Sequence, residues 1–270
     1  MPFFSDQMGR SVELKQSPER IISLVPSQTE LLFDLGLEKE VIGITKFCVH
    51  PGHWFHSKTR IGGTKDIRMD IIHQLHPDLI IANKEENNKK QIDELSKHYR
   101  VWISDIKTLN DALQMIESIG EITGKSNNAR TLINQIKEEF AILPQPQTTN
   151  YKLQIENYLQ TAYFIWRNPY MTAGGDCFIN DMMKYCGFKN IFDDLTRYPE
   201  ITIEQLQNAN CQLLLLSSEP YPFKEHHAEE LRTQLKSTKI ILVDGEMFSW
   251  YGSRLAKAPA YFTRLLQQIQ

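Results

Sequence analysis

The fold is decided by residues 20–36, which read RIISLVPSQTELLFDLG. The apolar run at residues 20–25 is typical of a strand buried in a parallel sheet. A helix follows at once, and Ser27 and Glu30 have the spacing of a capping box, in which each side chain bonds to the other residue's backbone N–H. Gly36 ends the helix, because glycine readily adopts the left-handed conformation needed there. The stretch therefore predicts a strand, a tight turn and a helix, which is the repeating unit of a parallel sheet.

Strands and helices alternate from this unit toward both ends of the chain, and a short hairpin that turns at Gly9 precedes it. Further strands are expected at residues 41–44, 78–82, 101–103, 162–166, 213–216 and 240–243. Helices are expected at residues 70–75, 87–98, 111–122, 127–143, 176–186, 204–209, 226–235 and 254–268. Alternation on this scale predicts an α/β fold whose parallel sheets are covered by helices on both faces.

The chain divides at a break in this pattern. Residues 144–146 read PQP and are followed by polar residues, after which the alternation restarts. The helix before the break contains neither Gly nor Pro, and its apolar residues recur at helical spacing. We therefore expect two Rossmann-like lobes, at residues 1–125 and 145–270, joined by a single long backbone helix at residues 126–144.

The two lobes repeat a pair formed by a short helix and a strand. Asp70 stands seven residues before Pro77 and leads into an apolar strand, and Glu204 stands seven residues before Cys211 and leads into another. Each acid falls in the first turn of its helix, where a carboxylate complements the helix dipole. Two symmetric carboxylates are also suited to bind two arginines of a partner, and the pattern leaves both explanations open.

The composition argues against several classes of protein. The net charge of −3 and the lack of a basic run do not fit a nucleic-acid-binding protein. No stretch approaches the ~18 consecutive apolar residues of a membrane span, and the first residues show no signal peptide. Cysteines that lie far apart are expected to be buried thiols. They are Cys48, Cys177, Cys186 and Cys211.

The loops at the carboxyl ends of the strands are the expected ligand site, because open parallel sheets bind ligands there. These loops hold a large share of the Trp, Tyr and His residues of the chain. Aromatic side chains on a concave surface suit a large, flat and partly apolar ligand. The simpler alternative is that they only cover the ends of the sheets.

Residues 48–56 read CVHPGHWFH and form the densest group of side chains able to bind a metal. Imidazole and thiolate favour zinc, iron and cobalt, but the spacing matches no closed zinc pattern. The segment is therefore an exposed His-rich loop, a catalytic metal site, or a loop whose His50 touches a metal within a bound ligand. The common nucleophile, phosphate-loop, dinucleotide and zinc-protease motifs are missing. Gly174-Gly175 is either a turn or an anion site at a helix N-terminus.

Four stretches carry a family resemblance. They are residues 20–30, residues 75–82, which read LHPDLIIA, residues 171–175, which read MTAGG, and residues 187–192, which read GFKNIF. Together they resemble the helical-backbone, or class III, periplasmic binding proteins, which deliver cobalamin, haem or ferric siderophores to ABC importers. The resemblance covers nearly the whole chain and implies two lobes with the helix at residues 127–143 between them.

The resemblance implies that the chain is the solute-binding component of an ABC importer. Its ligand would be a cobalamin-like corrinoid, haem or a ferric siderophore, bound in a cleft between the lobes. The residues that the resemblance places at the ligand are His50, Lys65, Asn83, Trp166, Tyr198, Trp250 and Tyr251. His50 is the candidate for an axial contact to the metal of the ligand. Lys65 and Asn83 replace aromatic residues of the cobalamin-binding type member, and His50, Lys65 and Arg197 favour a ligand with carboxylates.

The resemblance also implies partners and a location. Asp70 and Glu204 would dock on the membrane subunits of the importer, and the protein would be a monomer with no intrinsic cofactor and no covalent chemistry. Family members act in the periplasm, which requires a leader that is not seen in this sequence. The alternative is a cytosolic metal-dependent enzyme, or a cytosolic binder of corrinoids or metal chelates, that uses the Cys48–His56 cluster.

Overall fold

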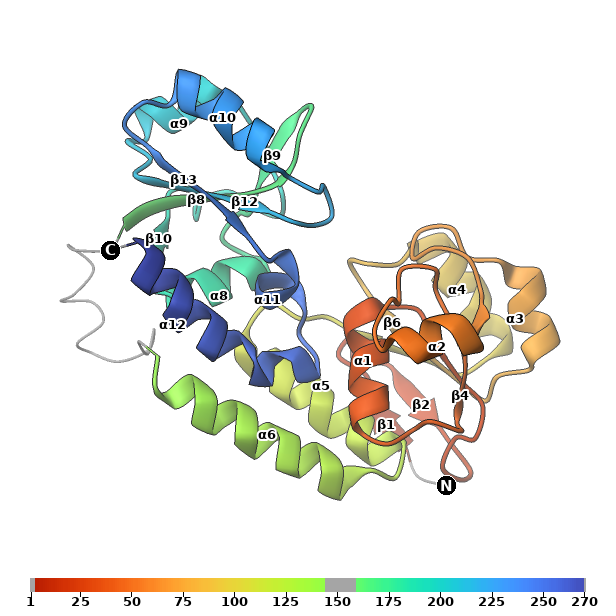
Figure 1. Ribbon diagram of the computed structural model, residues 1–270. Helices are drawn as coiled ribbons and strands as arrows, with labels where there is room; N and C mark the ends of the chain where they lie inside the picture. The colour runs from red at the N-terminus through yellow and green to blue at the C-terminus, as the bar shows by residue number, and fades with distance from the viewer. Residues whose placement is uncertain (1–2, 144–158, 270) are drawn as a thin grey trace. The chain divides into compact units, whose positions relative to one another are not determined.

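The computed structural model describes residues 3–143 and 159–269, and the chain forms two compact units (Figure 1). Unit 1 comprises Met1–Ile106, Asn110–Ile136 and Trp250–Ala256, and unit 2 comprises Lys107–Leu109, Lys137–Ser249 and Lys257–Gln270. Trp250–Ala256 therefore packs with unit 1, although all of residues 145–270 were expected in a C-terminal lobe. The other predicted boundaries stay predictions, and the break at residues 144–146 lies outside the described residues.

Unit 1 is built on a five-stranded parallel sheet. Its strands are β3 (Ile21–Ser23), β4 (Val41–Ile44), β5 (Thr59–Arg60), β6 (Leu79–Asn83) and β7 (Val101–Ser104). They lie in the order β5-β4-β3-β6-β7, and all neighbours are parallel. Every residue of β3 and β6 is buried, as expected for strands covered on both faces. The chain passes from β3 to β4 on one side and later to β6 on the other, which creates a switch point at the carboxyl end of β3.

Helices connect or follow these strands, and an antiparallel hairpin precedes them. The helices are α1 (Pro26–Asp34), α2 (Gly52–Ser57), α3 (Met69–Leu75), α4 (Lys89–His98), α5 (Leu109–Ile122), α6 (Ser126–Ala141) and the 3₁₀ helix η2 (Ser253–Ala256). The hairpin pairs β1 (Phe3–Ser5) with β2 (Ser11–Glu13), which confirms the predicted turn at Gly9. In α6, Ala129, Ile133, Ile136 and Phe140 are buried at the predicted helical spacing. This helix begins in unit 1 and ends in unit 2.

The N-terminus of α1 differs from the prediction. Val25 occupies the N-cap position, no side chain caps the helix, and Pro26 is its first residue. The predicted capping box between Ser27 and Glu30 was wrong, because the Glu30 carboxylate accepts hydrogen bonds from Arg254 instead. Gly36 follows the helix with a φ of 81°, as predicted.

Unit 2 is built on a mixed sheet of six strands. They are β8 (Leu159–Trp166), β9 (Tyr170–Thr172), β10 (Phe188–Asn190), β11 (Glu200–Ile201), β12 (Leu213–Ser217) and β13 (Lys239–Val243). β10, β8, β12 and β13 are parallel neighbours, whereas β9 is antiparallel to both β8 and β11. The expectation of a purely parallel sheet missed β9 and β11. Only residues 167–169 separate β8 from β9, which is too short for the crossover that parallel pairing requires.

The helices of unit 2 are α8 (Phe178–Tyr185), α9 (Ile203–Asn208), α10 (Glu225–Gln234), α11 (Gly245–Ser249) and α12 (Ala258–Ile269). A capping box begins α9: Gln205 N donates to Thr202 Oγ1 at 3.2 Å, and Thr202 N donates to Gln205 Oε1 at 2.7 Å. The prediction of one helix at residues 254–268 was wrong. Ser253–Ala256 forms η2, and α12 starts afterwards with Pro259 in its first turn, where the missing N–H of proline does no harm.

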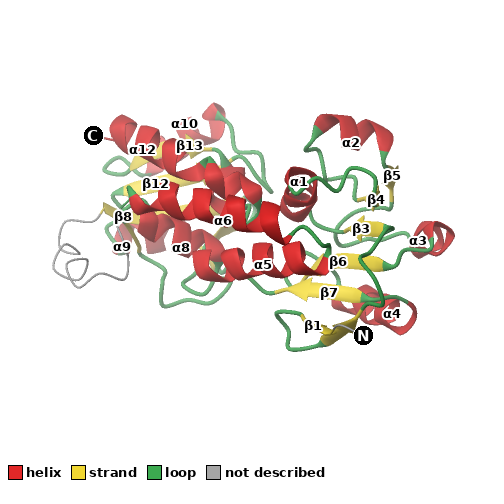
Figure 2. Cartoon of the chain, turned by 90° about the horizontal axis from the view of Figure 1, so that it is seen from below, coloured by secondary structure: helices red, strands yellow, loops and turns green. Residues whose placement is uncertain are grey.

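The two sheets repeat one another (Figure 2). The order β4-β3-β6-β7 in unit 1 corresponds to β10-β8-β12-β13 in unit 2, and Figure 2 labels all of these strands except β10. Asp70 and Glu204 are the second residues of α3 and α9, which lead into the equivalent strands β6 and β12. Both helices are followed by a left-handed residue, His76 with a φ of 44° and Asn210 with a φ of 51°. The repeat predicted from the sequence is therefore confirmed.

Helix α12 buries mainly one face. Its residues Ala258, Phe262 and Leu265 are buried, whereas Arg264 is exposed. This is the pattern of helices that cover a sheet. Within residues 3–143 and 159–269, no helix combines the length and the apolar character that crossing a bilayer requires.

Candidate functional site

The loop between β4 and α2 is anchored by Cys48, which is fully buried. Thr29 Oγ1 lies 3.0 Å from the Cys48 sulfur, and Thr45 Oγ1 lies 3.2 Å from the same atom. Burial raises the pKa of the Cys48 thiol, so the group stays protonated near neutral pH. A metal ligand or a nucleophile would have to be the thiolate. Cys48 is therefore a packing residue of this loop.

Two apolar side chains of the same loop are exposed. Phe47 is 51% exposed and Val49 is 43% exposed, on either side of buried Cys48. The ammonium of Lys46 lies 5.2 Å from the centroid of the Phe47 ring, within the range of a cation–π contact. Neighbouring exposed apolar residues often mark a binding surface. Sequence reasoning missed both residues, although their alternation with a buried residue was visible in the chain.

His50 contacts a buried aromatic residue. It is half-buried, and its ring meets the Trp250 ring edge-on, with 5.7 Å between centroids. The Arg254 guanidinium lies 4.5 Å from the centroid of the same indole, and donates to both Glu30 carboxylate oxygens at 2.8 and 2.9 Å. Trp250 and Tyr251 are only 6% and 7% exposed. Trp250 therefore supports His50 from within unit 1, and the contact of Trp250 and Tyr251 with a ligand stays a prediction.

Lys65 and Asn83 differ in what they offer to a ligand. Lys65 is exposed, and its ammonium donates to the carbonyl oxygen of Glu85. Asn83 is buried, and its side-chain NH₂ donates to Ser104 Oγ at 3.0 Å. Its amide oxygen accepts from the backbone N–H groups of Glu85 and Glu86 at 2.8 and 3.0 Å. Asn83 therefore orders the loop between β6 and α4, while Lys65 presents a positive charge on the surface.

Trp166 is the most exposed aromatic residue predicted to touch the ligand in unit 2. It ends β8, is 41% exposed and meets the Tyr221 ring edge-on, with 5.8 Å between centroids. The next residue, Arg167, donates to the Glu230 carboxylate oxygens at 2.6 and 2.9 Å. Tyr221 in turn lies within 3.1 Å of Nε2 of His227. These contacts hold the loop in place and leave a large part of the indole exposed.

The segment that carries Arg197 and Tyr198 packs against the glycine pair. Gly174 N donates to the carbonyl oxygen of Arg197 at 2.8 Å, and Gly175 N donates to that of Leu195 at 2.7 Å. These N–H groups already have partners, so the interpretation of Gly174-Gly175 as an anion site was wrong, and the pair is a turn. Arg197 is exposed and Tyr198 is half-buried. Their predicted contact with a ligand stays a prediction.

A polar cluster at the carboxyl ends of β12 and β13 was missed by sequence reasoning. The Tyr163 hydroxyl lies 3.1 Å from Ser217 Oγ, which donates to the Glu219 carbonyl oxygen at 2.6 Å. Ser249 Oγ donates to the Glu219 carboxylate at 2.6 Å. Burial raises the pKa of the Tyr163 phenol, so it remains a hydrogen-bond donor. The cluster has no local signal, because its members come from three separate parts of the sequence.

The histidines of residues 48–56 have separate partners. His53 Nε2 lies 3.3 Å from a Glu38 carboxylate oxygen, and the His56 ring packs edge-on against Phe55. Among the residues that the structure describes, no group of three or more His, Cys, Asp or Glu side chains is placed to hold a metal ion. The described side chains therefore do not support the interpretation of residues 48–56 as a protein metal site.

Asp70 and Glu204 are both exposed. Arg68 donates to the Asp70 carboxylate at 2.9 Å, and this hydrogen bond lowers the pKa of the Asp70 carboxyl. Thr202 and Gln205 complete the capping box of α9, so this cap forms without the Glu204 side chain. A carboxylate that the cap does not require suits a docking role. That role stays a prediction for both acids.

Comparison with known proteins gives consistent matches. The chain matches the periplasmic binding protein family over residues 21–240. It is 28% identical over 217 residues to the vitamin B12-binding protein of Vibrio vulnificus (strain CMCP6), covering 77% of this chain and 74% of that protein. It is 26% identical over 213 residues to the uncharacterized ABC transporter substrate-binding lipoprotein YvrC of Bacillus subtilis (strain 168), covering 76% of this chain and 65% of that protein. The structure of the periplasmic haem-binding protein RhuT from Roseiflexus sp. RS-1 has the same fold, with a TM-score of 0.77 and 20% identity over 94% of this chain and 99% of that one.

Proposed function

Because the chain belongs to the periplasmic binding protein family, we propose that it is the solute-binding component of an ABC importer. We propose that its ligand is a metal chelate, namely a cobalamin-like corrinoid, haem or a ferric siderophore. The names of the relatives support this class, since one is a vitamin B12-binding protein and another binds haem. A third is named as an ABC transporter substrate-binding lipoprotein.

The exposed apolar side chains on loops of both units carry this proposal. Phe47 and Val49 in unit 1 and Trp166 in unit 2 are each more than 40% exposed at the carboxyl end of a strand. Covering apolar surface is favourable by about 25 cal/mol per Å². Exposed apolar surface of this kind in each unit suits a large, flat and partly apolar ligand. Corrinoids, haem and many siderophores have such surfaces.

Positive charges on loops of each unit favour a ligand with anionic groups. Lys46 and Lys65 are exposed on loops of unit 1, and Arg197 is exposed in unit 2. Ammonium and guanidinium groups bind carboxylates through charge-assisted hydrogen bonds. We therefore favour a chelate that carries carboxylates, such as haem or a carboxylate siderophore, over cobalamin.

His50 is the candidate for a contact to the metal of the ligand. Imidazole is a common ligand of iron and cobalt. The ring is half-buried and contacts Trp250, which limits its orientation. We assign no covalent step to the site, because the relatives are named as binding proteins and the nearby Cys48 thiol is buried and protonated.

We infer that the protein acts outside the cytoplasmic membrane, as its periplasmic and lipoprotein relatives are named to do. Asp70 and Glu204 would dock the protein, as a monomer, on the membrane subunits of the importer. Their equivalent positions on α3 and α9 support this role, because symmetric carboxylates can engage two copies of one subunit.

A spectroscopic titration tests the ligand class. Purified protein is titrated with haemin and separately with aquocobalamin while the visible absorbance is recorded. We expect a saturable shift with one of the two. His50→Ala should remove the part of the shift that comes from an axial imidazole. If neither ligand gives a saturable shift and a ferric siderophore does not quench the tryptophan fluorescence, the proposed ligand class is wrong.

Variants at the exposed side chains locate the binding surface. Phe47→Ala and Trp166→Ala should each weaken ligand affinity about tenfold, which corresponds to about 1.4 kcal/mol. Phe3→Ala is the matched control, because it removes a ring that is 68% exposed on the β1–β2 hairpin. Equal effects of all three substitutions would contradict the assignment of the site to the carboxyl-end loops.

A further inference from the structure

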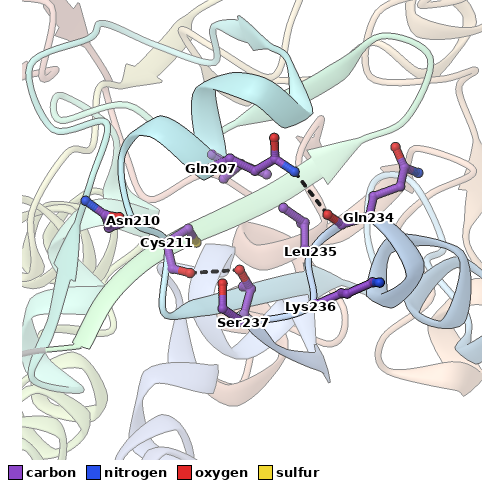
Figure 3. A pocket seen from close by; sticks show the side chains of 9 residues that line it. Gln207, Asn210, Cys211, Gln234, Leu235, Lys236 and Ser237 are labelled. Atoms are coloured by element: carbon purple, nitrogen blue, oxygen red, sulfur yellow. Dashed lines mark hydrogen bonds between the residues drawn. The ribbon is translucent and has the colours of Figure 1, made fainter.

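A pocket of about 320 Å³ lies in unit 2, at the end of the sheet opposite to the candidate ligand loops (Figure 3). It lies between the end of α9 and the segment that joins α10 to β13. Its lining includes Gln207, Asn210, Cys211, Leu235, Ser237 and Thr238. Its volume falls at the lower end of the range for ligand sites, roughly 300–1,000 Å³.

Two hydrogen bonds hold the walls of this pocket, and both are drawn in Figure 3. Gln207 Nε2 donates to the Gln234 carbonyl oxygen at 3.0 Å, and Thr238 Oγ1 donates to the Cys211 carbonyl oxygen at 2.8 Å. Cys211 and Leu235 are buried and supply apolar surface. Burial raises the pKa of Cys211 to about 11, so this wall is uncharged near neutral pH. The pocket therefore combines an apolar wall with amide and hydroxyl groups.

The strand register identifies the position in unit 1 that corresponds to this pocket. The paired residues are Ile80 with Val101 in β6 and β7, and Leu214 with Ile240 in β12 and β13. Tyr99 stands two residues before the start of β7, and Thr238 stands two residues before Ile240. The repeat therefore places Tyr99 in unit 1 where unit 2 has Thr238.

Tyr99 packs on α3 in unit 1. Its hydroxyl lies 2.7 Å from Nδ1 of His73, and the two ring centroids are 5.6 Å apart. His73 corresponds to Gln207, because each stands three residues after the acid of its helix, Asp70 or Glu204. Unit 2 keeps a polar side chain at this position but has the smaller Thr238 in place of the ring. Thr238, which lines the pocket, therefore stands at the position that a tyrosine holds in unit 1.

We propose that this pocket receives a tyrosine side chain from the protein partner that docks on α9. The ring would pack on Cys211 and Leu235, and its hydroxyl would donate to the amide oxygen of Gln207. Glu204 precedes Gln207 by three residues and therefore lies on the same side of α9. A partner whose cation binds Glu204 would bring a neighbouring side chain to the pocket. The inference rests on the proposed docking role of Glu204 and adds the chemistry of a second contact.

Titration with N-acetyl-tyrosine amide tests the pocket by itself. In isotopically labelled protein, we expect saturable shifts of the backbone amide signals of Gln207, Cys211 and Thr238. N-acetyl-phenylalanine amide should bind about fivefold more weakly, which is the loss expected for one net hydrogen bond. N-acetyl-leucine amide should not saturate. Thr238→Tyr, which installs the residue found in unit 1, should abolish the shifts.

Gln207→Leu is a second variant that does not depend on filling the pocket. It should remove the preference for the tyrosine analogue over the phenylalanine analogue. Shifts that spread over the whole surface, or that persist in Thr238→Tyr, would overturn the proposal. Cellular uptake of haemin or cobalamin, whichever binds, distinguishes failure of the pocket proposal from failure of the docking role. If Glu204→Ala abolishes uptake but no analogue binds, the pocket proposal alone fails, and if Glu204→Ala leaves uptake unchanged, the docking role itself fails.

Discussion

Units 1 and 2 share the order of their parallel strands, but they hold their carboxyl-end loops with different kinds of ion pair. In unit 1, the Arg254 and Glu30 side chains are only 9% and 10% exposed. In unit 2, those of Arg167 and Glu230 are 21% and 48% exposed. Removing one partner of a buried pair leaves an uncompensated charge, whereas water replaces a partner lost from an exposed pair. The same arrangement of strands therefore depends strongly on one charge pair in unit 1 and weakly on the other in unit 2.

The buried pair has a topological cause. Arg254 belongs to Trp250–Ala256, which packs with unit 1 although the segments on either side of it belong to unit 2. Gly252 approaches α1 so closely that a Cβ there would lie 2.4 Å from the Ser27 carbonyl oxygen. Ser253 donates to the Asp34 carboxylate. The Glu30–Arg254 pair is therefore one of several contacts that tie a distant segment to α1.

The largest expected effect on stability comes from removing one charge of the buried pair. The same change in the exposed pair is its control. Glu30→Gln should lower the free energy of unfolding by about 3–5 kcal/mol, because Arg254 stays buried without a counter-charge. Glu230→Gln should lower it by at most about 1 kcal/mol. Urea denaturation of both variants, followed by circular dichroism, gives the two values. Replacing both Glu30 and Arg254 with apolar residues should recover most of the loss, and equal effects of the two single variants would contradict the comparison.

Alkaline pH should destabilise unit 2 more than unit 1. Unit 2 contains three cysteines and unit 1 contains Cys48 alone. Burial raises the pKa of all four thiols, and to about 11 for Cys177 and Cys211. Unfolded thiols ionise near pH 8.5. The folded protein therefore keeps protons that the unfolded chain loses, and stability should fall as the pH rises from about 8.5 to about 11.

At about pH 9.5, each buried cysteine should lower the free energy of unfolding by about 1 kcal/mol. Thermal unfolding near pH 7 and near pH 9.5 measures this loss. Substituting alanine at all three cysteines of unit 2 should remove most of the pH dependence. Cys48→Ala should remove only a small part of it. If both variants keep the pH dependence of the unsubstituted protein, groups other than the thiols are responsible.

The docking acids should have the smallest effect on stability. Asp70→Ala and Glu204→Ala should leave the urea midpoint and the ligand affinity unchanged, because both side chains are exposed. Both should reduce uptake of the ligand in cells. Arg68 already donates to Asp70, so Arg68→Ala should improve docking through unit 1 by freeing that carboxylate. Lost ligand affinity in either acid variant would show that the acids belong to the ligand site.

Local patterns predicted most of the strands and helices, because the periodicity of buried residues is a local property. The apolar run at residues 20–25 and the equivalent positions of Asp70 and Glu204 are examples. The same reasoning failed at β9, where a three-residue connection imposes antiparallel pairing on a short strand. The ligand role of Asn83 came from the family resemblance and stays a prediction, and in the structure this side chain orders a loop.

The sequence by itself determined the α/β class, the internal repeat and membership of the periplasmic binding protein family. Each depends on patterns along the chain, which a single sequence displays directly. The tertiary structure alone decided that Glu30 pairs with Arg254 rather than capping α1, that Trp250 and Tyr251 are buried, and that a pocket lies beside Thr238. Glu30 and Arg254 are 224 positions apart, and no local pattern distinguishes their partners from the many other charged residues of the chain.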